Sequence, residues 1–418
     1  IDDGSCLPYV LGCMDSTSLA YDPLATIDDG SCSGGCMDPF ASNYDSLALY
    51  DNGNCCGSYL DWQQIGSAII GDVAYEYLGG AVSLSANGKV FAVGSGDRNQ
   101  CGTLGKVKIY NVVGNSLAQI GNTLIGPQIC DRFGISISLN SLGNIVVVGA
   151  PHFDVTVNDH QGLVRVYKNI SGNWTQLGSD FYGDSGDELG HSVSISDDGF
   201  TIAIGSPKKH VGGIIQAGQV KVFHFDTISN NWLQIGQSID GIYSYGRRGW
   251  AVSLNGNGDI LALSSPHANG PEEGQSSIYA FDGSSWNQLG QTIDPPFSSG
   301  SFGWSSALSN DGSTVVIGSD RYPSGNYDGC VLVYDFDGAY WNQKGSLITT
   351  SISQAHLGTS VSINSNGEKI VVGAPDAYSN DGYVETFEFK NNDWFSYGDT
   401  IRGYSGGRMG KAVCMSDD

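Results

Sequence analysis

Residues 191–236 read HSVSISDDGFTIAIGSPKKHVGGIIQAGQVKVFHFDTISNNWLQIG. Four short apolar runs, 191–196, 201–207, 219–223 and 232–236, alternate in this stretch with turn-forming residues. The runs are rich in Val, Ile, Phe and Trp and are bounded by Gly, Asn, Asp or Pro, which is the pattern of β-strands joined by turns. None shows the apolar spacing of a long helix, so the stretch predicts a unit of four antiparallel strands.

Two phrases of this unit recur along the chain at intervals of about 55 residues. The first is Trp-x-Gln-x-Gly, which begins at Trp62, Leu117 (the one substitution), Trp174, Trp232, Trp286, Trp341 and Trp394. The second is a Gly that opens a Ser-Val-Ser-like strand, at Gly79, Gly134, Gly190, Gly249, Gly303, Gly358 and Gly410. Four-stranded units repeated radially form a β-propeller. We therefore predict an all-β propeller for residues 58–418, with the Trp side chains on outer strands packed between blades.

The number of blades follows from the incomplete units at the two ends of this region. Seven first strands and seven Trp strands occur, but Trp62 has no blade before it and the strand at 411–415 has no second or third strand after it. The simplest closure is a seven-bladed propeller whose seventh, incomplete blade combines these two strands, and the chain is then expected to be a fragment of a longer protein. The alternative is six closed blades with one additional strand.

Residues 1–57 are expected to form a separate domain of small cysteine-rich repeats. This region holds nine Asp, no Lys or Arg, and six of the ten cysteines, and its Cys-Met-Asp phrase at residue 13 returns 23 residues later. Units this small cannot bury enough apolar surface to fold alone, so crosslinks or metal ions must help. The economical pairing is one disulfide within each unit, Cys13–Cys32 and Cys36–Cys55, although spacing alone leaves other connectivities open.

The matched carboxylates of these repeats are candidate ligands for Ca²⁺, which prefers oxygen donors. They are Asp15, Asp22, Asp28, Asp38, Asp45 and Asp51. In the alternative interpretation, the Asp-Gly and Tyr-Asp sequences only form turns and cap local backbone donors.

The overall composition limits the partners and the compartment. The formal net charge of −24, from 43 acidic and 19 basic residues, argues against nucleic acid and anionic membrane surfaces as partners. No apolar stretch reaches the length of about 18 residues that a membrane span requires. Paired cysteines in small units are typical of an oxidising compartment, so an extracellular or cell-surface location is expected. Within the propeller, Cys101 and Cys130 lie in loops on one face and are a candidate third disulfide.

The loops that connect second and third strands are the most variable parts of the repeats and are predicted to share one face. Four of the seven histidines fall in these loops and form a candidate ligand face: His152, His160, His210 and His267. Solvated polar loops are the alternative interpretation. Two Asn-x-Ser/Thr sequences, at Asn169 and Asn173, are candidate glycosylation sites in one predicted hairpin. No catalytic motif is recognisable in the sequence.

The second strands carry a resemblance to a known family. They end in Gly-Ala/Ser-Pro at 149–151, 205–207 and 373–375, and Phe-Gly pairs occur at 133–134 and 302–303. Residues 58–418 therefore resemble the FG-GAP repeats of integrin-α-type propellers. The calcium-binding D-x-D-x-D-G loop of that family has no counterpart here, since the corresponding turn at 253–258 reads SLNGNG. The N-terminal repeats are loosely similar to thrombospondin type 3 calcium repeats, without their D-x-D-x-D runs.

These observations predict an extracellular structural or adhesive repeat protein that is not an enzyme. Two repeat systems in series suit a subunit of a surface filament or appendage, with other copies of the chain or other extracellular proteins and glycans as partners. A glycan- or protein-binding receptor head that uses the ligand face is the alternative. A polysaccharide-active propeller enzyme is a more distant one.

Overall fold

The structure is a computed structural model. It describes residues 62–72, 76–95, 103–156, 159–268, 270, 273–297, 300–323 and 326–417, together with N-terminal pieces at 11–12, 23–24, 27–28, 34–35 and 50–51. The chain divides into two units, of which the first comprises Ile1–Gln63 and Tyr397–Asp399 and the second comprises Gln64–Ser396 and Thr400–Asp418. The predicted boundary after residue 57 lies outside the described residues.

The described part of the N-terminal repeats contains two pairs of short parallel strands and a turn at 23–24. β1 (Leu11–Gly12) pairs with β2 (Ile27–Asp28), and β3 (Gly34–Gly35) pairs with β4 (Tyr50–Asp51). The predicted disulfide residues Cys13, Cys32, Cys36 and Cys55 and the candidate calcium ligands Asp15, Asp22, Asp38 and Asp45 lie outside the described residues. Asp28 and Asp51 end β2 and β4. The crosslinks and the calcium site of this region therefore stay predictions.

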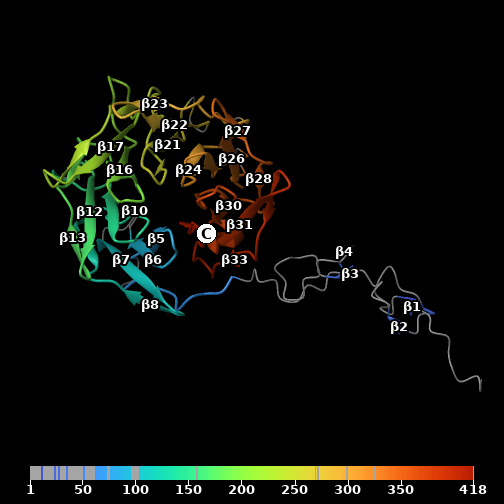
Figure 1. Cartoon of the computed structure of the whole chain (residues 1–418). Coiled ribbons are helices and arrows are strands. Elements are labelled where there is room, and N and C mark those ends of the chain that lie inside the picture. The colour runs from blue at the N-terminus through green and yellow to red at the C-terminus, as the bar shows by residue number, and fades with distance from the viewer. Residues whose placement is uncertain are drawn as a thin grey trace, which may run out of the picture. The chain divides into compact units, whose positions relative to one another are not determined.

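The second unit is built from antiparallel sheets of four consecutive strands, which are the blades of a propeller (Figure 1). Blade 1 contains β5 (Leu78–Leu84), β6 (Val90–Ser95), β7 (Leu104–Val113) and β8 (Ser116–Gln119). Blade 2 contains β10 (Ser136–Leu139), β11 (Ile145–Ala150), β12 (Leu163–Ile170) and β13 (Asn173–Gln176). Blade 3 contains β15 (Ser192–Ile195), β16 (Thr201–Ser206), β17 (Gln219–Asp226) and β18 (Asn231–Gln234).

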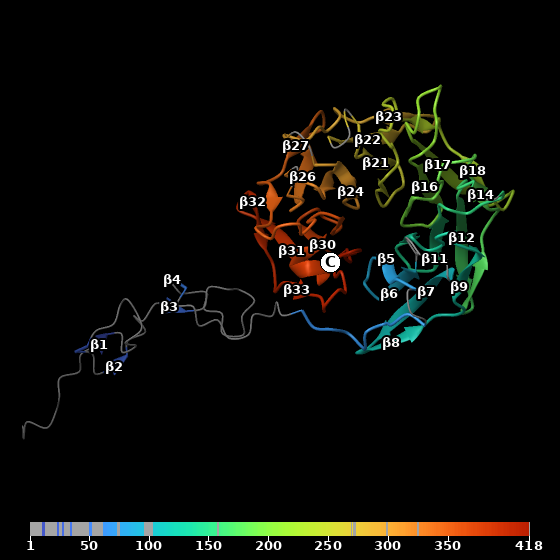
Figure 2. The ribbon, with the colours of Figure 1, turned by 180° about the vertical axis from the view of Figure 1, so that it is seen from behind.

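Blades 4 to 6 continue the same order around the ring, as the reverse view shows (Figure 2). Blade 4 contains β20 (Val252–Leu254), β21 (Ile260–Ser265), β22 (Gln275–Phe281) and β23 (Trp286–Gln288). Blade 5 contains β24 (Phe302–Leu308), β25 (Thr314–Ser319), β26 (Cys330–Phe336) and β27 (Trp341–Gln343). Blade 6 contains β29 (Ser360–Ile363), β30 (Lys369–Ala374), β31 (Tyr383–Lys390) and β32 (Asp393–Ser396).

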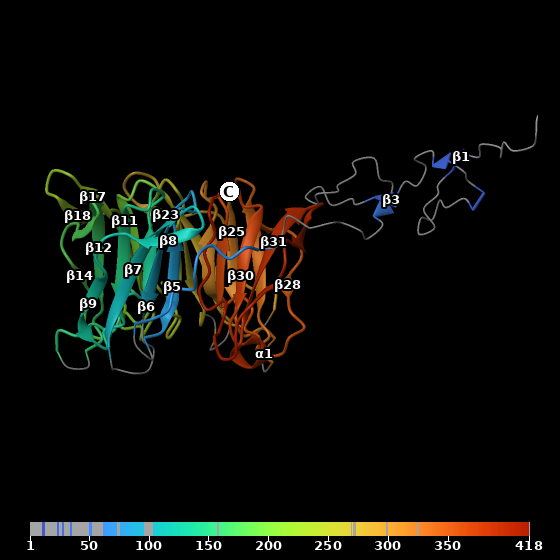
Figure 3. The ribbon, with the colours of Figure 1, turned by 90° about the horizontal axis from the view of Figure 1, so that it is seen from below.

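A short fifth strand pairs with the third strand in every blade except blade 4. These strands are β9 (Leu124–Ile129), β14 (Phe181–Tyr182), β19 (Ile239–Asp240), β28 (Ile348–Thr349) and β33 (Ile401–Arg402). In blade 4 a single bridge, Ser276 to Ile293, stands in its place. The one helix of the described residues, α1 (Ala377–Asn380), lies between β30 and β31, at the face of the ring opposite the C-terminus (Figure 3). No described helix is long and apolar enough to cross a membrane.

The second strands form the buried middle of each blade. Every residue of β11, β16 and β25 is buried, which explains why these strands are apolar throughout instead of alternating. Gly149 of β11 packs directly on the next blade, because a Cβ there would lie 2.1 Å from the carbonyl oxygen of Gly190. A glycine in the second strand and the recurrent Gly that opens the next blade thus let neighbouring blades touch through their backbones.

The Trp motif joins each blade to the blade before it, as predicted. The five Trp side chains of blades 2 to 6 are buried, and each indole Nε1 donates a hydrogen bond of 2.8–3.2 Å to a carbonyl at the end of the preceding blade's fourth strand. The donor and acceptor pairs are Trp174–Ile120, Trp232–Leu177, Trp286–Ile235, Trp341–Leu289 and Trp394–Lys344. The Gly of the motif follows that carbonyl, and a Cβ there would clash with the indole.

The described residues form six blades, so the predicted seven-bladed propeller is wrong. A blade needs second and third strands, and the described chain supplies this pair six times. Trp62, counted in the prediction as the outer strand of a seventh blade, lies in no strand and is 46% exposed. Residues 411–417 form no strand either. The alternative of six blades with one additional segment is closer to the structure.

The additional C-terminal segment closes a ring of backbone hydrogen bonds. The turns between first and second strands donate from one blade to the next, with N···O distances of 2.8–3.3 Å. The N–H donors and C=O acceptors follow the order Ala86, Ser141, Asp197, Gly256, Asn310, Ser365, Asp417 and again Ala86. Asp417 therefore links blade 6 to blade 1 and completes the circle.

Three cysteines of the second unit are described. Cys330 and Cys414 are free thiols, and burial raises the pKa of each to about 12. Cys130 is disulfide-bonded. Its predicted partner, Cys101, lies outside the described residues.

Candidate active site

Backbone hydrogen bonds join the described ends of the loops of one face to the next blade. The loop between β11 and β12 runs parallel to the segment that leads into blade 3, and three backbone hydrogen bonds connect them. Gly186 N–H donates to Asp159 at 2.7 Å, Glu188 N–H to His160 at 3.0 Å and Leu189 N–H to Gln161 at 3.1 Å. Parallel bridges at Gly218–Arg248, Gly274–Phe302, Gly329–Leu357 and Gly382–Met409 repeat this arrangement. The described ends of these loops therefore form a platform for side chains beside the next blade.

Two of the four predicted ligand-face histidines meet a buried carboxylate on this platform. His152 Nε2 lies 3.1 Å from Glu188 Oε1, and the rings of His152 and His160 have centroids 4.2 Å apart. Lys208 Nζ lies 2.8 Å from the same Glu188 oxygen. The carboxylate is 8% exposed and the His152 side chain 16% exposed. Blades 2 and 3 thus contribute a histidine pair, a carboxylate and an ammonium group to one cluster.

The environment keeps Glu188 ionised and His152 neutral near neutral pH. Burial raises the pKa of Glu188, but hydrogen bonds from His152 and Lys208 lower it to about 2 overall. The pKa of His152 is lowered from 6.5, chiefly by burial, and the charge of Arg132 adds to this against the effect of Glu188. Because His152 is then neutral, Lys208 supplies the positive charge beside the carboxylate.

A neutral His152 that donates its Nε2–H to Glu188 carries its lone pair on Nδ1. No described residue forms a hydrogen bond with that nitrogen. A carboxylate that orients a neutral imidazole in this way is the arrangement of a general base.

The same donors can hold a metal ion. His152, His160 and Glu188 each offer one ligand atom, and these atoms lie within 4.8 Å of one another. Two imidazoles and a carboxylate suit divalent transition metals. Lys208 already contacts the Glu188 oxygen, so a bound metal ion would compete with the lysine for the carboxylate.

The sequence prediction missed Glu188, although its repeat position carries a signal. It is the residue two before the recurrent Gly, which we call the lead-in residue. The lead-in residues Tyr77, Arg132, Glu188, Arg247, Ser301, His356 and Arg408 differ in chemistry, yet all have positive φ, from +51° to +59°. Non-glycine residues in this conformation concentrate at functional sites. The backbone conformation is the same at every lead-in position, whereas the side chain differs from repeat to repeat. A functional side chain can therefore stand at this position without a change of fold.

The other predicted ligand-face residues lie elsewhere. His210 is exposed, and the His267 ring packs against Trp250, with centroids 6.2 Å apart. A second cluster, not predicted, places His356 between Asp320 and Asp376 at 3.7 and 3.8 Å, with Arg408 paired to Asp376. Carboxylates face both ring nitrogens of His356, so this cluster lacks the open nitrogen that His152 has.

The two candidate glycosylation sites differ in exposure. Both lie in the hairpin of β12 and β13. Asn173 is exposed, whereas the Nδ2 atom of Asn169 is buried without a hydrogen-bond partner. Asn173 is therefore the more accessible of the two amides.

Comparisons with known proteins identify the fold. No family model matches the chain, and no curated protein does. Solved structures with this architecture include a candidate 6-phosphogluconolactonase from Bacteroides uniformis, at TM-score 0.54 and 14% identity, covering 78% of this chain and 85% of that one. The periplasmic gluconolactonase PpgL of Pseudomonas aeruginosa matches at TM-score 0.54 and 16% identity, over 81% and 88% of the two chains. Kuenenia stuttgartiensis hydrazine synthase matches at TM-score 0.54 and 11% identity, over 84% and 93%.

These likenesses contradict the predicted function. A structural or adhesive protein that is not an enzyme was expected because no catalytic motif was recognisable, but two of the structural neighbours are described as lactonases. Short linear motifs do not reveal a site assembled from loops of adjacent blades, as at His152 and Glu188. At 14–16% identity the likeness establishes the β-propeller and nothing finer. The resemblance to FG-GAP and thrombospondin type 3 repeats stays a prediction.

Proposed function

We propose that this protein is a hydrolase that opens the internal ester of a sugar lactone at the His152–Glu188 cluster. The observation that carries the proposal is the 3.1 Å contact between His152 Nε2 and the buried Glu188 carboxylate. It leaves the opposite nitrogen of a neutral imidazole available as a base. The lactonase descriptions of the structural neighbours support the ester class of substrate.

The proposed reaction uses the chain's own side chains. His152 Nδ1 takes a proton from water while the water oxygen bonds to the lactone carbonyl carbon. The ring C–O bond then breaks, and the imidazolium returns the proton to the departing ring oxygen, which gives a hydroxy acid. Glu188 orients the imidazole and stabilises its charged form. Lys208 and Arg132 add positive charge that favours the anionic tetrahedral intermediate.

The test is lactone hydrolysis by the purified chain, measured above the spontaneous rate with gluconolactone, 6-phosphogluconolactone and a non-sugar lactone. His152→Asn should lower kcat by about 10²- to 10⁴-fold, the contribution of a positioned base. His210→Asn is the matched control, because it changes an exposed histidine of the neighbouring blade. As the pH falls, protonation of His152 should reduce the wild-type rate. The pH at which half the rate is lost should lie below 6.5, since the pKa of His152 is lowered from that value.

Three outcomes would contradict the proposal. Hydrolysis no faster than the spontaneous reaction, or equal rates for the wild type and His152→Asn, would remove the site. Activity that is lost with a chelator and restored by Zn²⁺ would replace the His152 base by a metal-bound water held by the same three residues.

The extracellular location expected from the cysteine content is part of the proposal. The disulfide at Cys130 supports it, because disulfides persist mainly in oxidising compartments.

A further inference from the structure

Blade 4 departs from the other blades at three positions that lie close together. The residue before the recurrent Gly is apolar in all other copies, namely Leu78, Phe133, Leu189, Phe302, Leu357 and Met409. In blade 4 it is Arg248, which is nevertheless only 7% exposed. The third strand of blade 4 begins Gln275-Ser276, and the residue equivalent to Ser276 is Val in each of the other five blades, namely Val107, Val164, Val220, Val331 and Val384. The fifth strand is reduced to the bridge between Ser276 and Ile293.

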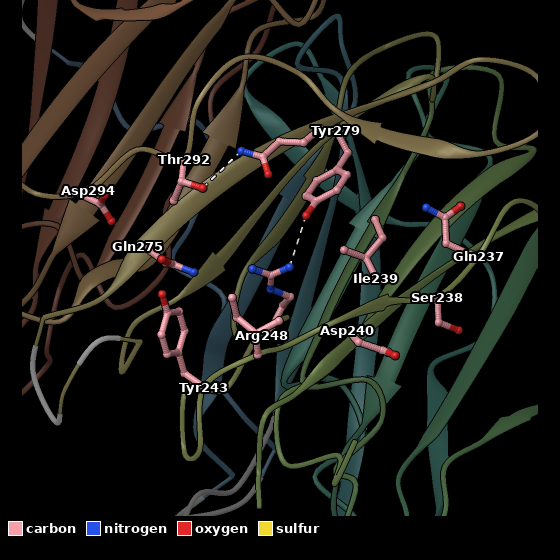
Figure 4. Close-up of a pocket in the computed structure, with 12 residues that line it drawn as sticks. Gln237, Ser238, Ile239, Asp240, Tyr243, Arg248, Gln275, Tyr279, Thr292 and Asp294 are labelled. Carbon is pink, nitrogen blue, oxygen red and sulfur yellow. Dashed lines mark hydrogen bonds between the residues drawn. The ribbon is translucent and has the colours of Figure 1, made fainter. Parts of the chain in front are cut away.

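These substitutions surround a groove between blades 3 and 4. Its volume is about 490 Å³, within the range of small-molecule sites. Blade 3 contributes residues of the segment 237–243, and blade 4 contributes Gln275, Tyr279, Gln288, Thr292 and Asp294. Arg248 lies among them, with its guanidinium turned toward Tyr279 (Figure 4). The residues on either side of the Ile293 bridge, Thr292 and Asp294, both face the groove.

Arg248 is a buried charge that has no counterion among the described residues. Its Nη1 donates to the Tyr279 hydroxyl at 3.3 Å, while its Nε is buried without a hydrogen-bond partner. It forms no ion pair with any residue of the described ranges, and the carboxylates of Asp240 and Asp294 line the groove without reaching it. Burying an unpaired guanidinium costs several kcal/mol unless an anion compensates it. An arginine kept at an otherwise apolar repeat position therefore indicates a missing anionic partner.

The other residues that line the groove indicate the chemistry of that anionic partner. Ser238, Tyr243 and Thr292 offer hydroxyl groups, Gln275 and Gln288 offer amides, and two carboxylates can accept hydrogen bonds from a ligand's hydroxyls. Guanidinium groups bind carboxylates in a bidentate manner. The two acidic residues disfavour a ligand with more than one negative charge. We propose that the groove binds a polyhydroxylated monocarboxylate, that is, a sugar acid, with its carboxylate on Arg248.

This site is separate from the His152 cluster and does not depend on the proposed hydrolase. Its test is binding of D-glucuronate, D-glucose and glucose 6-phosphate to the whole chain by titration calorimetry. D-glucuronate should bind most tightly. Arg248→Leu should weaken its binding by about tenfold to hundredfold, the worth of a hydrogen bond to a charged group, and leave glucose binding unchanged.

The variants distinguish a loss of binding from a loss of folding. Leu stands at the Arg248 position in blades 1, 3 and 6, so we expect Arg248→Leu to fold, which circular dichroism checks. Arg247→Ser is the control, because it removes one positive charge from the protein, as Arg248→Leu does. Arg247 does not line the groove, lies 5.5 Å from the Trp250 ring, and has Ser301 as its counterpart in blade 5. Tyr279→Phe removes one hydroxyl and provides a second, milder variant.

Three results would overturn the proposal. The first is that the wild type binds D-glucuronate no better than D-glucose. The second is that it binds glucose 6-phosphate more tightly than D-glucuronate, and the third is that Arg247→Ser weakens binding as much as Arg248→Leu. The first removes the role of the carboxylate, the second assigns a different anion, and the third reduces the effect to overall charge.

Discussion

Replacing Trp341 by Ala tests whether the Trp motif holds adjacent blades together. The indole is 2% exposed, and a buried Trp removes about 150–250 Å² from water, which at about 25 cal/mol per Å² corresponds to about 4–6 kcal/mol. Measured Trp→Ala costs in protein cores are about 3–5 kcal/mol. The Nε1 hydrogen bond of 2.8 Å to Leu289 adds about 1 kcal/mol. We expect a loss of about 4–6 kcal/mol in the free energy of unfolding.

The matched control is Trp62→Ala, which removes the same side chain from another copy of the motif. Trp62 is 46% exposed, so its loss should cost less than about 1 kcal/mol. Urea unfolding followed by far-ultraviolet circular dichroism measures both variants without relying on Trp fluorescence. A cost under about 1 kcal/mol for Trp341→Ala would refute the wedge between blades. Equal costs for the two variants would show that Trp62 is packed as the other Trp residues are.

Two further predictions concern backbone space and pH. Gly290→Ala should destabilise the fold more than Gly338→Ala, because both glycines have positive φ but only Gly290 would place a Cβ 2.8 Å from Trp341; equal urea midpoints would contradict this. Glu188 has a folded pKa of about 2, below its ordinary 4.5, so the unfolded chain binds more protons in this interval. The stability from Glu188 is present above pH 4.5 and is lost toward pH 2, by up to about 3 kcal/mol. Glu188→Gln should lack this loss when urea midpoints are compared across that range, and identical pH profiles for the two proteins would count against it.

The repeat pattern was sufficient to predict the strands and the packing between blades. The spacing of the Trp motif correctly placed Trp174 and Trp394 on outer strands, and the recurrent glycines mark where backbones touch. The blade count could not be read in the same way, because one Trp motif and one first strand do not make a blade. Whether the Trp62 segment and the segment at 411–415 pair in one sheet depends on a second and a third strand between them. Trp62 carries the Trp motif but lies in no strand.

The candidate sites were harder to predict, for a physical reason. His152 and His160 were identified because histidines in loops are conspicuous, whereas Glu188 resembles an ordinary loop acid until the blades are assembled. Arg248 was missed for the opposite reason, since one charged residue among apolar counterparts appears only when all seven copies are aligned with one another. Both residues owe their chemistry to a contact between neighbouring blades.

The circle of hydrogen bonds through Ala86, Asp197 and Asp417 has a direction. Every peptide group in it donates in the same rotational sense. The row of peptide dipoles is therefore closed and leaves no unpaired donor or acceptor at an end. Removing any one turn would create two unsatisfied groups together, an amide on one side and a carbonyl on the other, each costing about 1–3 kcal/mol where water cannot replace the partner. The backbone carbonyl of Asp417 accepts from Ser365, and its backbone N–H donates to Ala86. Asp417 thereby connects the last blade to the first.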